Sequence, residues 1–129
     1  DIIIMKKIAL KIKPEAMKSG LNVMVDWYGD TRTFYPGKLI KKLRKNWGVE
    51  LNRDGEICKA SIPYEAMTIN TGYAEDGRML MATKEDEAYH LSKKHTDWLM
   101  SLVIKPEGVP REAIKRAGIE ELSTGGANA

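Results

Sequence analysis

The chain has 129 residues, which is the size of one domain with a single hydrophobic core. Hydrophobic residues make up 43% of it and charged residues 30%, a composition that excludes an intrinsically disordered chain. The net charge is only +3, because 21 Lys and Arg stand against 18 Asp and Glu, so overall charge does not by itself indicate nucleic-acid binding.

The sequence also indicates the cellular compartment of the protein and its division into domains. The chain has one cysteine, Cys58, which excludes an internal disulfide and a cysteine-based zinc site and predicts a reducing compartment such as the cytoplasm. Lysines interrupt the apolar opening, so we predict neither a signal peptide nor a membrane span there. We expect one compact domain over residues 1–122 and a flexible tail over 123–129.

Alternating apolar and polar residues predict two strands early in the chain. Residues 6–13 place apolar side chains on one side and lysines on the other, which is typical of a half-buried strand near a sheet edge. Residues 21–28 alternate in the same way. The side chains predicted to face inward there are Leu21, Val23, Val25 and Trp27.

Residues 37–47 change to helical spacing. At about 100° per residue, one quadrant holds the apolar side chains Leu39, Ile40, Leu43 and Trp47. The opposite side holds Lys38, Lys41, Lys42 and Lys45, with Arg44 on the flank. No acidic residue stands four positions from these lysines to balance them. We therefore predict a helix with one apolar face and one cationic face.

Two turn sequences predict hairpins after this segment. "NRDG" separates two short apolar runs within residues 49–62, and "AEDG" separates a second pair less cleanly. The longest predicted helix follows, over residues 84–104. Thr83 is its expected N-cap, Asp86 stands in the capping-box position, and Pro106 ends it.

A short last helix is predicted from Pro110 to Gly118, because proline favours the first turn of a helix and glycine its end. Together these elements predict an α+β fold, with a mostly antiparallel sheet of about five to six strands and two to three packed helices.

The stretch "GKLIKKLRKNWGVELNRDG" resembles the opening helix and hairpin of HicA-type toxins, which are small messenger-RNA-cleaving proteins with a double-stranded-RNA-binding-like fold. "VPREAIKRAGIEEL" is similar to the way such chains end. In that family a glycine-serine-histidine signature follows the turn, whereas this chain has Glu56, Ile57 and Cys58. The resemblance therefore carries no catalytic residue over to this chain.

Other reactive side chains form no assembled site in the sequence. His95 falls on the apolar stripe of the long helix and His90 on its polar face, so we predict that the two do not converge as metal ligands. A hydrogen-bonded structural role is the main interpretation of His95, and a base or pH switch is the alternative. Cys58 reads as a buried small hydrophobe. We predict no catalytic residue, cofactor or metal.

Two functional hypotheses remain. The first is a small non-enzymatic protein-binding regulator or inhibitor, of the kind common among phage and mobile-element accessory factors, which docks on an acidic protein surface. The second is a nucleic-acid-binding protein that contacts phosphates. A solvated helix face without a partner is the third interpretation. The predicted contact residues are Lys38, Lys41, Lys42, Arg44 and Lys45, together with Arg32 and Tyr35 just before them.

Overall fold

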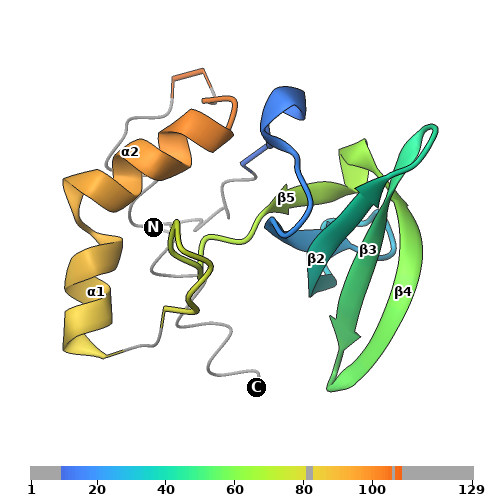
Figure 1. Cartoon of the computed structure of the whole chain (residues 1–129), viewed down its shortest axis with the longest axis horizontal. Coiled ribbons are helices and arrows are strands. Elements are labelled where there is room, and N and C mark those ends of the chain that lie inside the picture. Colours follow the sequence, from blue (N-terminus) through green and yellow to red (C-terminus); the bar gives the residue numbers. More distant parts are fainter. Residues whose placement is uncertain (1–9, 81–82, 106, 109–129) are drawn as a thin grey trace, which may run out of the picture.

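A computed structural model of the chain describes residues 10–80, 83–105 and 107–108. Within these residues a five-stranded antiparallel sheet lies beside two short helices (Figure 1), which confirms the predicted α+β class. The helix predicted from Pro110 and the tail predicted over 123–129 lie outside the described residues.

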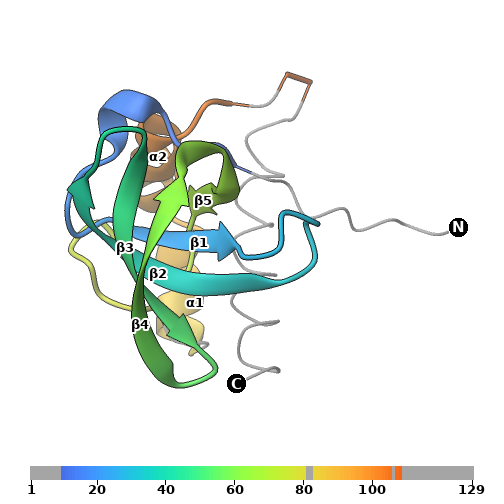
Figure 2. The ribbon, with the colours of Figure 1, turned by 90° about the vertical axis from the view of Figure 1, so that its right-hand side faces the viewer.

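The sheet is an antiparallel meander whose fifth strand returns to pair with the first. Figure 2 shows its strong twist. Two single 3₁₀ turns, η1 (Pro14–Ala16) and η2 (Tyr64–Ala66), precede the first and the fifth strand. The strands, in the spatial order β4-β3-β2-β1-β5, are β1 (Asn22–Asp26), β2 (Phe34–Lys42), β3 (Asn46–Arg53), β4 (Glu56–Pro63) and β5 (Met67–Ile69).

The alternation seen in the sequence predicts β1 and the β3–β4 hairpin correctly. Val23 and Val25 of β1 are almost fully buried, while Trp27 beyond the strand is half-buried. β3 and β4 pair over eight consecutive residues around a two-residue turn. Both turn residues, Asp54 and Gly55, have positive φ, which is the backbone of a type I′ hairpin.

The helix predicted over residues 37–47 is wrong. This segment is the second half of β2, a tight turn and the start of β3. A register shift between Leu39 and Lys41 marks a β-bulge, and it puts Lys38 and Lys41, three residues apart, on the same face of the sheet. The bulge and the turn after it thus place the lysines of this segment at the spacing that is typical of one face of a helix, which explains the wrong prediction. Pairing with β1 and β3 on either side outweighs the helix propensity of lysine and leucine.

The single long helix predicted over 84–104 is two helices, α1 (Lys84–His90) and α2 (Lys93–Leu102). The N-cap prediction is confirmed, because the Thr83 hydroxyl accepts a hydrogen bond from the Asp86 N–H at 3.1 Å. Ser92 caps α2 in the same way through the His95 N–H. Neither helix, nor any other in the described ranges, is long and apolar enough to cross a membrane.

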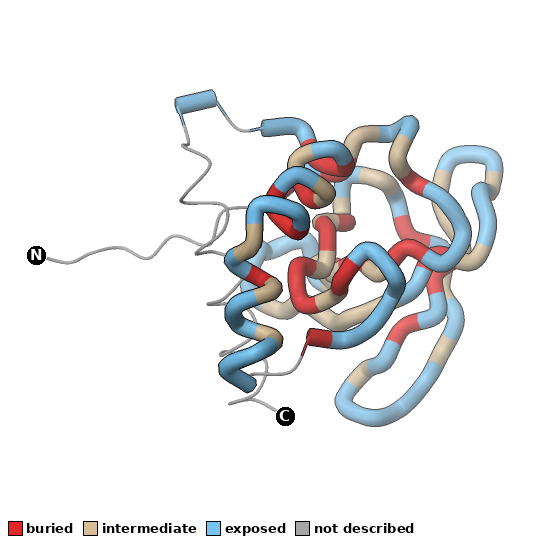
Figure 3. The backbone as a smooth tube through the Cα atoms, turned by 60° about the vertical axis from the view of Figure 1, so that its left-hand side comes forward, coloured by how far each residue is buried: buried red, intermediate tan, exposed pale blue. Residues whose placement is uncertain are grey.

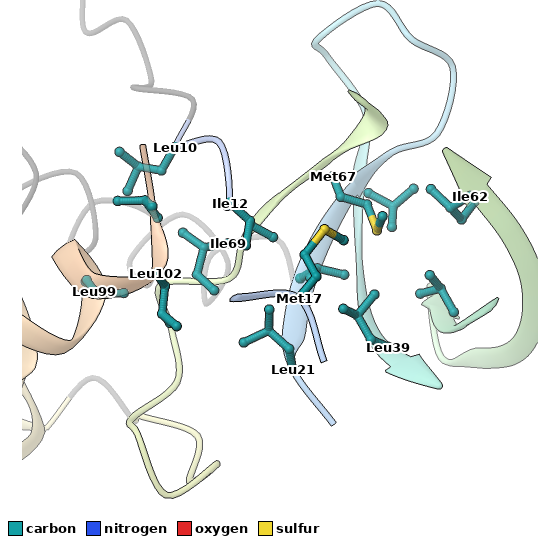
Figure 4. Packing of buried hydrophobic residues seen from close by; sticks show 14 of the residues in the cluster. Leu10, Ile12, Met17, Leu21, Leu39, Ile62, Met67, Ile69, Leu99 and Leu102 are labelled. Carbon is teal, nitrogen blue, oxygen red and sulfur yellow. The ribbon is translucent and has the colours of Figure 1, made fainter. Parts of the chain in front are cut away.

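Residues 10–13 join the sheet to the helices. Lys11 forms a bridge with Thr68 of β5, and Ile12 forms one with Val103, just after α2. The strand predicted over residues 6–13 is therefore present as two isolated bridges in its described part. The buried side chains of both halves form one core, which Figure 3 shows along the backbone and Figure 4 in close view.

We predict that Gly37→Ala destabilises the fold by about 1–3 kcal/mol, because a Cβ at this position would lie 2.7 Å from Val49 Cγ1 and 3.2 Å from Leu51 Cδ2. Urea unfolding measures the change. Gly48→Ala is the matched control, since its Cβ would meet nothing closer than 3.6 Å. Equal stability of the two variants would contradict the close approach of β2 to β3.

Candidate functional site

The predicted contact lysines lie on a strand and a turn. We call Lys38, Lys41, Lys42, Arg44 and Lys45 the basic surface. The first three belong to β2, and the last two form the tip of the turn between β2 and β3. All five are exposed. The Leu43 N–H donates to the Asn46 carbonyl at 2.8 Å and closes the turn.

Strand pairing decides which of these side chains share a face. Lys38 stands opposite Glu50, and Glu50 stands opposite Lys59, so the three form a row across the solvent-facing side of the sheet. Lys41 lies on that same side, opposite Gly48. Lys42 pairs instead with Trp47, which packs against the core. The cations are therefore spread over a strand face and its end.

The basic surface is only partly neutralised. No ion pair within 4 Å joins any of its five residues to another described residue. Glu50 lies between two lysines of the row and lowers the local positive potential there, whereas Lys41, Arg44 and Lys45 have no acidic residue opposite them in the strand pairing. The end of β2 and its turn are thus more cationic than the strand middle.

The other two predicted contact residues lie elsewhere. Arg32 is in the β1–β2 loop, and Tyr35 is at the start of β2. Tyr35 lies seven positions before Lys42 on the extended chain, a span of about 20 Å. Figure 1 shows the two ends of β2 well apart. The structure therefore does not bring the seven predicted residues together, and it divides them into the basic surface and a second group near Tyr35.

Arg53 joins this second group, and the sequence analysis missed it. Its guanidinium carbon lies 4.5 Å from the Trp27 ring centroid and 5.6 Å from that of Tyr35. The sequence does place Arg53 just before the "DG" turn. However, the stacking depends on three strand ends that meet only in the folded sheet.

The prediction that His90 lies on a polar face opposite His95 is wrong. Both side chains are buried, and their ring centroids are 4.5 Å apart. The chain changes direction at Leu91 and Ser92, between α1 and α2, and this turn brings the rings together. Tyr89 and Trp98 each lie with their ring centroids 5.5 Å from that of His95.

The surroundings of His95 favour its neutral form. Neither ring nitrogen has a hydrogen-bond partner among the described residues, so the hydrogen bond expected from the sequence is not there. Burial, and to a smaller degree the neighbouring His90, lower the pKa of His95 from 6.5 to about 4. A neutral, desolvated imidazole among aromatic rings is suited to packing.

Other reactive groups do not converge within the described ranges. No group of three or more His, Cys, Asp or Glu there is placed to hold a metal ion. The sequence predicts a buried Cys58; in the structure this free cysteine on β4 is half-buried and packs against the core. It makes no hydrogen bond to the ring nitrogens of His95.

The pKa of His95 predicts a pH dependence of stability. The unfolded chain protonates this residue near pH 6.5 and the folded chain only near pH 4, so the unfolded state binds more protons between these values. We expect the free energy of unfolding to fall as the pH drops through this window, by at most about 3 kcal/mol.

Urea unfolding over this pH range measures the loss. His95→Gln does not titrate and is expected to show a shallower decline, and the difference between the two profiles isolates His95 from the carboxylates. If the stability of the wild type and of His95→Gln fell in parallel with pH, His95 would have the same pKa in the folded and the unfolded chain, which would contradict the prediction.

No protein-family model matches the chain, and no curated protein or solved structure does so either. The HicA-type resemblance implied a helix where β2 lies, so no property of that family is carried over. The function is therefore argued from the side chains described above.

Proposed function

We propose that the protein is a small non-enzymatic regulator or inhibitor that binds an acidic protein surface through the basic surface. The observation that carries this proposal is the display of five exposed cations within eight residues, without an ion pair to any described residue. The single free cysteine suits a reducing compartment such as the cytoplasm, where we place this function.

The hairpin makes this surface suitable for docking. Leu39 is almost fully buried between the lysines of β2, and Trp47 packs against the core just after the turn. The backbone that carries the cations is consequently held by the core. Charges held in fixed positions steer an oppositely charged protein and set its orientation more than they add raw affinity.

The mixed charge of the sheet face favours a protein over nucleic acid. Glu50 interrupts the row of Lys38 and Lys59, and a continuous phosphate backbone would meet that carboxylate. An acidic protein can place its carboxylates beside the lysines and leave Glu50 in water. Nucleic-acid binding stays the alternative, because lysines and arginine at the turn also suit phosphate.

Beside these lysines the sheet offers an apolar contact and an open edge. Ile57 on β4 is 59% exposed on the same face as Lys59. β4 pairs only with β3 among the described strands, so its other edge is available for backbone hydrogen bonds. A partner that combines acidic and apolar side chains fits this surface.

We predict that a fluorescently labelled oligoglutamate binds the protein and that added salt weakens the binding. Lys41→Glu combined with Lys45→Glu is expected to weaken it roughly tenfold, since each reversal replaces an attraction with a repulsion. Fluorescence anisotropy across a salt series measures the affinity.

Lys84→Glu combined with Lys94→Glu is the matched control, because it changes the net charge equally at two exposed positions on α1 and α2. If both double variants lost the same affinity for oligoglutamate, the binding would depend on net charge alone, and this result would contradict the proposal. Generic duplex DNA and RNA are titrated in parallel. If they bind and oligoglutamate does not, the nucleic-acid function replaces the proposed one.

A further inference from the structure

A half-buried arginine stacked on two aromatic rings lies at the end of β2 remote from the basic surface. Arg53 stands over Trp27 and Tyr35, at 4.5 and 5.6 Å from its guanidinium carbon to the ring centroids. The two rings meet edge to face, with centroids 6.3 Å apart and planes at 74°. We call Arg53, Trp27 and Tyr35 the arginine cradle.

Three strands hold the cradle in place. The Trp27 N–H donates to the Thr33 carbonyl at 3.1 Å, which fixes the residue directly after β1. Tyr35 stands opposite the buried Val25 within the β1–β2 pair. Arg53 is the last residue of β3, next to the tight turn into β4. The position of the guanidinium beside the two rings is therefore set by the folded sheet before any ligand binds.

The N–H donors of the Arg53 guanidinium have no acceptor in the part of the chain that the structure describes. A guanidinium carries five N–H donors and no acceptor. The Arg53 side chain forms no hydrogen bond and no ion pair with any described residue, and its Nε is buried without a partner. The two terminal nitrogens are not among the buried unpartnered atoms, so they reach the surface. An accessible guanidinium whose donors have no acceptor among the described residues is able to bind an anion.

We infer that the arginine cradle binds a carboxylate of a protein partner, held by the fork of terminal N–H groups on Arg53. A carboxylate matches this fork with two parallel hydrogen bonds. The Trp27 and Tyr35 rings beside the guanidinium restrict its position and shield part of it from water, which strengthens the charged hydrogen bonds.

Nearby acidic residues favour a single carboxylate over a chain of phosphates. Asp54 follows Arg53 directly, and Glu56 stands opposite it in the β3–β4 pair, and both are exposed. Asp26 at the end of β1 and Asp30 in the β1–β2 loop accept hydrogen bonds from the backbone of that loop. A polyanion that ran past Arg53 would meet Asp54 and Glu56, whereas one carboxylate needs only the fork.

The identity of this occupant rests on the proposed protein-binding function, because it assigns one acidic side chain of the same partner to the cradle. The geometry of the cradle does not depend on that function. The exposed Tyr28, 65% accessible in the adjoining loop, gives such a partner an apolar contact beside the carboxylate.

The test uses the complete chain and a short peptide, blocked at both ends, with one central glutamate. Its twin carries glutamine instead. We expect the glutamate peptide to shift the Arg53 Nε–Hε and Trp27 indole N–H resonances and to bind about tenfold or more tightly than the twin. Arg53→Lys keeps the charge but loses the fork, and it is expected to abolish this preference.

Arg44→Lys on the basic surface is the matched control and is expected to leave the preference intact. Equal binding of the two peptides, no response at Arg53, or an unchanged preference in Arg53→Lys would each overturn the inference. Inorganic phosphate is titrated as well, and a response to it without one to the glutamate peptide would overturn the assignment of a carboxylate. If Arg53→Lys fails to fold, the wild-type titrations decide alone.

The experiments can disprove each of the two proposals independently of the other. Lys41→Glu combined with Lys45→Glu is expected to leave the peptide response of Arg53 unchanged, since these residues lie at the far end of β2. Conversely, Arg53→Lys is expected to leave the salt-dependent oligoglutamate binding unchanged.

Discussion

The fold depends on backbone hydrogen bonds made by one short segment, residues 10–13. The Leu10 carbonyl accepts from the Ile69 N–H of β5, while the Lys13 N–H donates to the Leu102 carbonyl at the end of α2. The Tyr64 hydroxyl also donates to the Ile12 carbonyl between them. Because the Ile12 side chain is only 1% exposed, its burial and these hydrogen bonds support each other. The helices and the sheet therefore share one core.

This shared core sets the frame for the charged groups. Leu39 packs into the core from the inner face of β2. The lysines of β2 therefore face the solvent or lie at the end of the strand. At the opposite end of the same strand, Trp27 and Tyr35 are only half-buried, and the side chain of Arg53 lies on them. Two different cationic features thus lie at the two ends of β2, a diffuse one for steering and a stacked arginine, contributed by β3, that is suited to a single contact. A partner that used both would be oriented along β2.

The histidine pair shows how local geometry changes the meaning of a sequence pattern. On one continuous helix, residues five apart point in different directions. Ser92 instead starts a new helix, and the turn before it brings the rings of His90 and His95 together. Serine is a preferred N-cap residue, so the sequence contained a signal for a new helix at Ser92. The apolar residues at helical spacing continue across this position, however, and they favoured one long helix. The structure makes this pair part of the packing between α1 and α2.

Patterns of period two and local turn chemistry were sufficient to predict much of the fold from the sequence. β1 follows from its alternating valines, the β3–β4 hairpin from Asp54 and Gly55, and the start of α1 from Thr83 and Asp86. Each of these depends on contacts close in sequence or on the simple division between core and solvent. The exposure of the basic residues was likewise predictable, since Lys and Arg are rarely buried.

Only the tertiary structure decided which secondary-structure element carries the basic residues and which side chains come into contact. Residues 37–47 have good helix formers and helical spacing, yet pairing with β1 and β3 makes their first half a bulged strand, because backbone hydrogen bonds to two neighbours outweigh a weak local preference. Arg53 reaches Trp27 and Tyr35 by the same pairing, which aligns residues that are distant in the chain. The sequence by itself therefore determined the fold class and the presence of a basic surface, while strand register decided its shape and assembled the arginine cradle.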